Sequence, residues 1–399
     1  MQRVGVQWLA WSLTGSYAWL AATVLAEAVA IMAFLPFFGT VVDRGDRLIL
    51  ARWAQFTLII LAALLATLTL LNLVTIWLLI VLMGVYGTAQ AFWTPIRLSM
   101  AANLVPHDSL PSAIGIGAVL YGLAQFIGPA IAGLILATMG DHRDSIGYLF
   151  LLNSTTFCGY LAVLFMISLH TQEQRKDKAL NFLDDLMEGV RYCVHKEGLG
   201  LFMIYLLLVN ILLRSHRELL AGLADGVYGA GVGGFAALQS AAGLGAIVGS
   251  ALLTKFSRVE GLTHLLLGAT MIGIIFQIAM IAAPTFWVGL GTVGFLAGFL
   301  SFYSIGSQVL VQSSIHSTVR GRVMSLWAMG TRGGSPMGAW AIGLAAEVWG
   351  LRSALSGATV IFLVVFLYMV PRRKKLADAM ERPPGEDLPS TLANRNNES

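Results

Sequence analysis

Long apolar runs alternate with short polar turns along almost the whole chain. A helix needs about 20 apolar residues to cross the roughly 30 Å hydrocarbon layer of a bilayer, and the sequence supplies such runs one after another. They are too long and too continuously apolar for the alternating strands of a membrane barrel. The pattern therefore predicts an all-α polytopic membrane protein.

The runs form two sets of six, separated by a polar segment. The first run, residues 4–13, has about half the length of a membrane crossing. The predicted full-length spans are 18–42, 48–71, 76–104, 112–139, 146–169, 199–223, 233–256, 262–283, 286–315, 323–348 and 351–370. We therefore expect two six-helix halves that begin with a short helix.

The short first run has two explanations. Either the start of the sequence lies inside a longer first helix, or the helix is a true half-span with Arg3 near the middle of the bilayer. A charge at that depth is costly. We therefore expect a truncated first helix whose real start lies upstream, and this leaves open whether the chain as given is active.

Four segments follow from the pattern. Residues 1–169 are predicted to be the N-terminal transmembrane half, and residues 199–371 the C-terminal half. Between them, residues 170–198 are predicted to be a cytoplasmic linker with one amphipathic helix, because apolar residues recur there at helical spacing between charges. Residues 372–399 begin with four basic residues, continue rich in Pro, Asn and Ser, and are predicted to be a disordered cytoplasmic tail.

Composition agrees with a membrane protein and narrows the function. Of the 399 residues, 57% are hydrophobic and only 12% charged, whereas soluble domains carry about 25% charged residues. The two cysteines support neither a disulfide framework nor a metal site. In this setting the net charge of +4 reports loop orientation and does not imply nucleic acid as a partner.

The loop charges predict the orientation. Basic residues gather in the loops on the side of residues 43–47, in the linker and at the start of the tail, whereas the opposite loops hold only Arg143 and Arg352. Cytoplasmic loops carry the excess of Lys and Arg. We therefore expect a multi-pass protein of the plasma (inner) membrane with its C-terminus in the cytoplasm.

The charged turn between the second and third helices resembles a known family. Gly39, Asp43, Arg44 and Arg47 match the G-x-x-x-D-R-x-x-R loop of the major facilitator superfamily. The turn at 320–326 and the linker resemble its drug:proton antiporter branch, which includes macrolide and enterobactin exporters.

The fifth helix resembles the glycine-rich pattern of the proton antiporters. The matching positions are Gly115, Gly128, Pro129 and Gly133. Ala124 and Ala132 stand where that pattern has glycine. The small residues permit close helix contact, and the proline bends the helix. Packing without any role in coupling is the alternative for these four residues.

The resemblance implies secondary active transport. It implies alternating access by two rocking halves, with export of an amphipathic small molecule, such as a drug, a macrolide or a siderophore, driven by proton entry. The implied partners are this small molecule and the lipid bilayer. A monomer is expected, with the proton gradient as energy source and no cofactor.

The opening turn is a candidate gate. Asp43 would accept hydrogen bonds from a neighbouring helix N-terminus, while Arg44 and Arg47 would pair with acidic groups or lipid phosphate. Such contacts would hold the cytoplasmic side shut. The alternative is that these residues only anchor the loop on the cytoplasmic side.

Two charges are predicted near the membrane midplane. Glu27 lies about 13 Å from the outer end of its helix, and Arg332 lies about as far from the inner end of the eleventh helix. The superfamily resemblance places these two helices face to face. We therefore expect Glu27 and Arg332 to pair, with protonation of Glu27 loosening the pair. A purely structural ion pair is the alternative.

A second charged cluster interrupts the seventh helix. It comprises Arg214, His216, Arg217 and Glu218. In the superfamily this helix lines the cavity, so the cluster is a candidate for binding an anionic substrate group or relaying protons through His216 and Glu218. A solvated outer rim is the alternative.

Other function classes fit less well. A lipid or lysolipid translocator remains open beside the exporter. An enzyme is not expected, because the sequence has no nucleophile elbow, zinc spacing or phosphate loop and its loops are short. A non-transporting membrane protein such as a sensor would need a cytoplasmic partner domain, and the sequence shows none.

Overall fold

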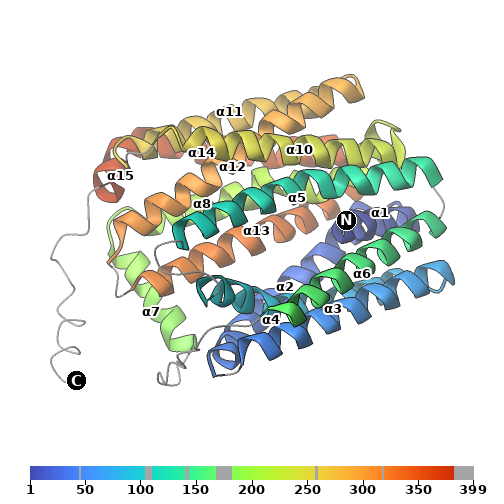
Figure 1. Ribbon diagram of the computed structural model, residues 1–399. Helices are drawn as coiled ribbons and strands as arrows, with labels where there is room; N and C mark the ends of the chain where they lie inside the picture. Colours follow the sequence, from blue (N-terminus) through green and yellow to red (C-terminus); the bar gives the residue numbers. More distant parts are fainter. Residues whose placement is uncertain are drawn as a thin grey trace.

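A computed structural model of the chain shows a bundle of long helices (Figure 1). It describes residues 1–44, 46–103, 110–139, 143–167, 182–256, 259–316 and 319–381. Within these ranges no strand occurs. The predicted all-α class is therefore confirmed.

Six helices precede the linker. They are α1 (Gln2–Thr14), α2 (Tyr17–Arg44), α3 (Arg47–Leu70), α4 (Ile76–Asn103), α5 (Leu110–Met139) and α6 (Arg143–Met166). The first is short, as the apolar pattern predicts. The turn between α1 and α2 marks one end of the bundle, which we call the α1–α2 end.

The linker contributes the amphipathic helix α7 (Phe182–His195), and we call the opposite end of the bundle the α7 end. The seventh spanning segment changes helix type along its length: α8 (Leu199–Leu208), the π-helical η2 (Val209–Leu213), the 3₁₀-helical η3 (Arg214–Leu219), α9 (Leu220–Gly222) and the π-helical η4 (Leu223–Val227). The remaining helices are α10 (Gly231–Leu253), α11 (Leu262–Ala282), α12 (Phe286–Ser314), α13 (Arg320–Trp349), α14 (Leu351–Met369), η5 (Val370–Arg372) and α15 (Arg373–Met380).

The helices suit a membrane. Among the residues that the structure describes, nine helical segments are long and apolar enough to span a bilayer. α1 is too short for this, and the described part of α5 contributes the apolar stretch Phe126–Leu136. α13 has the length, but its arginines lower its hydropathy. The chain is an integral, multi-pass membrane protein.

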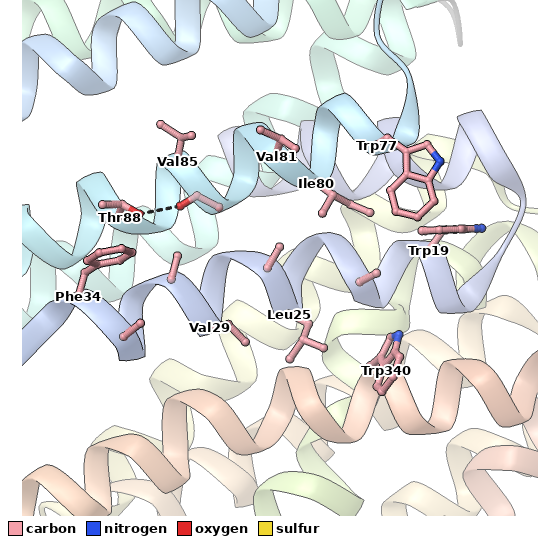
Figure 2. Close-up of a pocket in the computed structure, with 15 residues that line it drawn as sticks. Trp19, Leu25, Val29, Phe34, Trp77, Ile80, Val81, Val85, Thr88 and Trp340 are labelled. Carbon is pink, nitrogen blue, oxygen red and sulfur yellow. Dashed lines mark hydrogen bonds between the residues drawn. The ribbon is translucent and has the colours of Figure 1, made fainter. Parts of the chain in front are cut away.

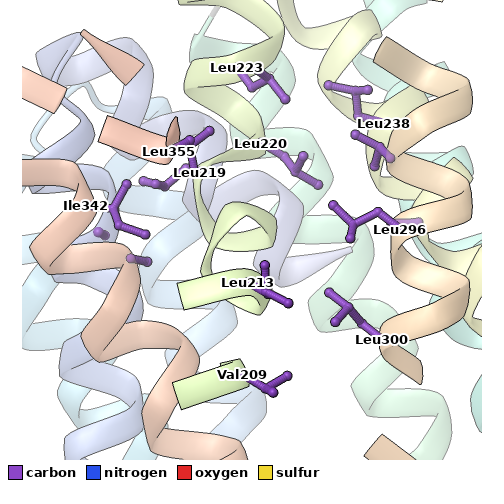
Figure 3. Close-up of a cluster of buried hydrophobic side chains, with 14 of the residues drawn as sticks. Val209, Leu213, Leu219, Leu220, Leu223, Leu238, Leu296, Leu300, Ile342 and Leu355 are labelled. Carbon is purple, nitrogen blue, oxygen red and sulfur yellow. The ribbon is translucent and has the colours of Figure 1, made fainter. Parts of the chain in front are cut away.

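The core is continuous through the second half. Buried leucines from the broken seventh segment, among them Leu213, Leu219 and Leu220, lie near Leu238 of α10 and Leu296 of α12 (Figure 3). The two halves are joined where α2 packs on α13 and α5 on α10. This arrangement places the seventh segment, with its charged cluster, in the interior.

Glycines let α10 and α12 approach closely. A Cβ atom at Gly249 would collide with the carbonyl oxygen of Gly298, and one at Gly245 with that of Gly294. Helices pack in lipid through such small residues because backbone contact replaces the hydrophobic effect between helices.

The start of the tail departs from its predicted disorder. Residues 373–380 form helix α15, whose Leu376 and Met380 are buried. Glu381 follows, and its carboxylate accepts hydrogen bonds from the backbone N–H groups of Gly261 (2.6 Å) and Thr263 (2.8 Å) at the N-terminus of α11. The prediction of disorder was wrong for these residues because it relied on the four basic residues and overlooked the apolar residues that follow them. Residues 382–399 lie outside the described part of the chain.

We expect Gly249→Ala to destabilise the protein by about 1–3 kcal/mol, the usual cost of forcing extra methyl groups into packed structure. The matched control is Gly291→Ala on α12, because a Cβ atom there meets nothing within 4 Å. Thermal unfolding in detergent, followed by size-exclusion fluorescence, measures both. Equal unfolding temperatures would contradict the close contact.

Candidate functional site

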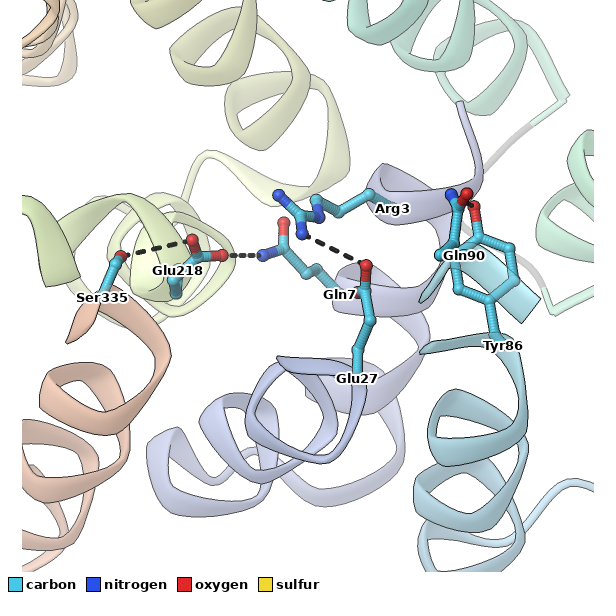
Figure 4. A network of polar contacts seen from close by, with 7 residues as sticks. All are labelled: Arg3, Gln7, Glu27, Tyr86, Gln90, Glu218 and Ser335. Atoms are coloured by element: carbon cyan, nitrogen blue, oxygen red, sulfur yellow. Dashed lines mark hydrogen bonds and ion pairs between the residues drawn. The ribbon is translucent and has the colours of Figure 1, made fainter. Parts of the chain in front are cut away.

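Helix α1 carries a polar face into the centre of the bundle (Figure 4). The Gln7 side-chain amide donates a hydrogen bond to Glu218 Oε2 (3.1 Å), and Gln239 Nε2 donates to Gln7 Oε1 (2.9 Å). Ser335 Oγ donates to the other oxygen of Glu218 (3.4 Å). All four side chains are buried. Glu218 therefore accepts hydrogen bonds on both oxygens from elements of both halves.

The seventh segment positions Glu218 through its irregular backbone. π-helical and 3₁₀-helical turns replace the regular α-helix from Val209 to Leu219. Such departures are frequent at functional sites. His216 lies in the same stretch, and its Nδ1 donates to the carbonyl oxygen of Leu213 (2.6 Å). His216 and Glu218 are both buried, so the solvated-rim alternative fails for them, whereas Arg214 and Arg217 are partly exposed.

Glu27 pairs with Arg3 and not with Arg332. The distance from Arg3 Nη2 to Glu27 Oε1 is 3.3 Å, and the side chain of Glu27 is only 13% exposed. Arg332 has an exposed side chain on α13. The expected Glu27–Arg332 pair is therefore absent from this conformation. The reason is that α1 lies beside α2, so that Arg3 contacts the carboxylate of Glu27. Arg3 lies on the same face of α1 as Gln7, which contacts Glu218.

Close packing against α4 also fixes the position of the Glu27 backbone. A Cβ atom at Gly87 of α4 would collide with the backbone carbonyl of Glu27. On α1, Arg3 and Gln7 are four residues apart, which places them on one face of the helix. One helix thus contacts carboxylates of both halves, Glu27 on α2 and Glu218 on the seventh segment.

The two halves are in contact at the α1–α2 end. Trp11 Nε1 donates to Asp225 Oδ2 (2.8 Å), and Ser16 Oγ donates to Glu347 Oε1 (2.7 Å). On α13, a Cβ atom at Gly343 would lie 2.8 Å from the carbonyl oxygen of Tyr17. These contacts close that end.

The contact between α2 and α13 ends near the middle of both helices. Gly333 still packs on Met32, where an added Cβ atom would lie 2.5 Å from Met32 Sδ. Beyond that point Phe34 and Phe37 of α2 are exposed, and residues 324–331 of α13 are all at least partly exposed. The halves therefore separate towards the α7 end.

A groove of about 740 Å³ lies between α2 and α4, with Trp340 of α13 at its side (Figure 2). Trp19 and Trp77 meet edge to face in it, with ring centroids 4.7 Å apart. The hydroxyl of Thr88 donates to the carbonyl of Gly84 within α4 (3.0 Å). The groove therefore offers an almost wholly apolar surface, suited to hydrocarbon.

The residues that carry the family resemblance are described only in part. The structure describes the backbone but not the surroundings of Gly39 and Gly115, and it does not describe the side chains of Asp43 and Arg44. Arg47 begins α3 and is partly exposed. The cap of this helix is a residue that the sequence analysis did not single out: Asp46 Oδ1 accepts from the N–H groups of Leu48 (2.8 Å) and Ile49 (3.1 Å).

On α5 the matching residues face helices of both halves. A Cβ atom at Gly133 would collide with Ala236 of α10, and one at Gly128 would lie 3.3 Å from the backbone nitrogen of Met1. Pro129 lies within the helix. Gly133 therefore allows the α5–α10 contact that joins the halves.

The sequence analysis missed several polar side chains of the central site. Gln7, Gln239 and the Trp11–Asp225 pair were not singled out, although polar side chains within apolar runs are costly and normally find partners or functions. That signal was present in the sequence. As for metals, no group of three or more His, Cys, Asp or Glu side chains suited to an ion occurs among the described residues.

Comparisons with known proteins agree with this architecture. A family model described as "Transmembrane secretion effector" matches residues 1–397. The chain is 23% identical to the staphyloferrin A transporter of Staphylococcus aureus, over 94% of this chain and 93% of that protein. It is 21% identical to macrolide efflux protein A of Streptococcus pyogenes, over 91% and 90%.

Solved structures share the fold at low identity. A bacterial homologue of the human lysosomal transporter Spinster, inward-facing and unoccupied, has a TM-score of 0.68 at 14% identity, covering 96% of this chain and 95% of that chain. An inward-facing bacterial homologue of the iron transporter ferroportin has a TM-score of 0.67 at 16% identity, covering 92% and 95%. The nucleoside transporter NupG has a TM-score of 0.66 at 14% identity, covering 92% and 96%.

We expect Gln7→Leu to lower the free energy of unfolding by about 1–3 kcal/mol, because a buried carboxylate loses a hydrogen-bond donor. Thermal unfolding in nanodiscs measures the loss. The control is Gln90→Leu, since Gln90 donates to the Tyr86 hydroxyl (2.9 Å) and not to Glu218.

A double-mutant cycle identifies the cause. In a Glu218→Gln background, Gln7→Leu should cost less than half of its effect in the unsubstituted protein, because no buried charge is left short of a donor. An equal cost in both backgrounds would show that Gln7 acts through packing alone.

Proposed function

The chain belongs to the transmembrane secretion effector family of the major facilitator superfamily, and we propose that it exports amphipathic small molecules in exchange for protons. It is a transporter and not an enzyme. The names of two relatives, one a staphyloferrin A transporter and one a macrolide efflux protein, support small-molecule export. We place it in the inner membrane as a monomer, with its C-terminus in the cytoplasm.

Alternating access is supported by where the halves touch. They are in contact at the α1–α2 end, through pairs such as Trp11–Asp225 and Ser16–Glu347, and α2 and α13 separate beyond Met32 and Gly333. Loop charges assign the α7 end to the cytoplasm. This conformation is then the inward-open state, and transport requires the contacts at the α1–α2 end to break.

The observation that carries proton coupling is the pair of carboxylates held by α1. Glu27 belongs to the first half and Glu218 to the second, and α1 contacts them through Arg3 and Gln7 respectively. Protonation of Glu27 removes its negative charge and with it the electrostatic attraction for Arg3. Protonation of Glu218 turns one of its two hydrogen-bond-accepting oxygens into an O–H donor. Either event weakens the attachment of α1 to one half. Protonation can thereby bias the equilibrium between the two conformations.

The opening turn is the proposed gate of the opposite state. When the α7 end closes, Asp43 would accept hydrogen bonds from a neighbouring helix N-terminus, with Arg44 and Arg47 completing the contact. Its sequence match to the superfamily loop supports this role. Loss of transport in Asp43→Asn would support it further, and unchanged transport would remove it.

A lipid or lysolipid translocator is the second candidate. The apolar groove between α2 and α4 favours it, because exposed Val29, Trp77 and Val81 line a surface that an acyl chain could occupy. The charged side chains of Glu27 and Arg332 favour the small-molecule exporter, because charges within the membrane-spanning part mark substrate and ion pathways. Transport of a fluorescent lysolipid, in preference to soluble dyes, would decide for the translocator.

We expect Glu27→Gln to reduce export driven by an imposed pH gradient by about 5- to 150-fold, the range that follows from coupling free energies of about 1–3 kcal/mol. The assay follows a panel of dyes in proteoliposomes with and without a proton uncoupler. Glu197→Gln is the control, because Glu197 lies at the surface with a 72% exposed side chain.

Uncoupler-insensitive export would rule out proton exchange. Unchanged gradient dependence in Glu27→Gln would move the coupling role to Glu218, where Glu218→Gln repeats the test. Failure of every dye to move would remove the exporter assignment.

A further inference from the structure

Arg332 lies where α13 changes from packed to open. Residues 333–336 are all buried, and Gly333 packs on Met32 of α2, whereas residues 324–331 are at least partly exposed. The side chain of Arg332 is itself exposed. It therefore stands at the inner limit of the contact between the halves, where the space between them begins.

This position is deep within the membrane-spanning part. Arg332 follows the start of α13 at Arg320 by about 18 Å and precedes its end at Trp349 by about 25 Å, at a rise of about 1.5 Å per residue. A guanidinium at such depth is costly unless it has a counter-charge or lines a water-filled space.

Arg332 does not face lipid. The lipid-facing side of α13 is marked by exposed apolar residues at helical spacing, namely Met337, Trp340, Leu344 and Val348. At about 100° per residue, Arg332 is turned by about 140° from Met337 and by about 80° from Trp340. It therefore lies outside this stripe. Gly343, which is turned by only about 20° from Arg332, packs on the backbone of Tyr17 of α2, so this side of the helix borders the other half.

The two interior carboxylates, Glu27 and Glu218, contact side chains other than Arg332. Glu27 is paired with Arg3, and Glu218 accepts hydrogen bonds from Gln7 and Ser335. Among the described residues no carboxylate lies within ion-pair distance of Arg332. Within the described part of the chain, the guanidinium of Arg332 therefore has no carboxylate in direct contact as a counter-charge.

We propose that Arg332 is the anchor for a carboxylate or similar oxyanion group on the transported molecule. The planar guanidinium matches a carboxylate through two parallel hydrogen bonds. An amphipathic anion supplies the missing counter-charge, and a cation is repelled from the same position. The inference rests on the proposed export function and narrows its substrate class to amphipathic anions.

Direct binding tests this without a gradient. The full chain in nanodiscs of zwitterionic lipid is titrated with carboxyfluorescein and with rhodamine 123, two dyes of similar ring system and opposite charge, and fluorescence anisotropy is followed. The anionic dye should bind more tightly. Arg332→Gln should weaken its binding by about tenfold or more, and Arg332→Lys by less, because Lys keeps the charge but loses the paired geometry.

The control is Arg373→Gln on α15, an exposed arginine outside the spanning segments, which should leave binding unchanged. Equal binding of both dyes, or an equal effect of Arg332→Gln and Arg373→Gln, would overturn the anchor. Thermal unfolding of each variant separates loss of binding from loss of fold. The export assay tests proton exchange independently of this binding assay. If export is insensitive to the uncoupler while dye binding still depends on Arg332, proton exchange is ruled out but the proposal of an anionic substrate is retained.

Discussion

The structure depends on a single constraint, that a polar side chain within the membrane must find a partner. Helix α1 is short, yet it carries Gln7 and Trp11 into the interior, and its half-exposed Arg3 lies against Glu27. Each contacts an acidic side chain, Glu27, Glu218 or Asp225. Because leaving these groups unpaired in a water-poor interior is costly, the contacts fix α1 between the two halves. The position of the central site follows from this placement.

Small residues make the same arrangement possible. Gly133, Gly333 and Gly343 each lie where an added Cβ atom would meet the opposite half. Backbones can approach closely at these points, and the polar pairs at the α1–α2 end can then form at normal hydrogen-bond distances. The packing that closes one end of the bundle thus also brings the interior charges together. A change that separates the halves at this end must break polar contacts and helix packing at once.

The irregular seventh segment links the polar network to the proposed transport cycle. Its π-helical and 3₁₀-helical turns hold Glu218 towards α1 and Ser335. A stretch of 3₁₀ backbone within a helix often marks a functional hinge. Arg332, one turn before Ser335 on α13, borders both this network and the open space. Protonation of Glu27 or Glu218 and binding of an anion at Arg332 would therefore act on neighbouring parts of the interface between the two halves.

Apolar run lengths in the sequence were sufficient to predict the helical class, the two sets of six segments, the short first helix and the linker helix, because the bilayer fixes the length and polarity of a spanning helix. The sequence also located the rare interior charges Glu27, Glu218 and Arg332. It could not determine the partner of Glu27, because that depends on which helix lies beside α2, and the pairing with Arg3 emerged only from the packing of α1. The Gln7–Gln239–Glu218 network and the folding of residues 373–380 onto α11 were likewise decided by tertiary contacts between segments far apart in the chain.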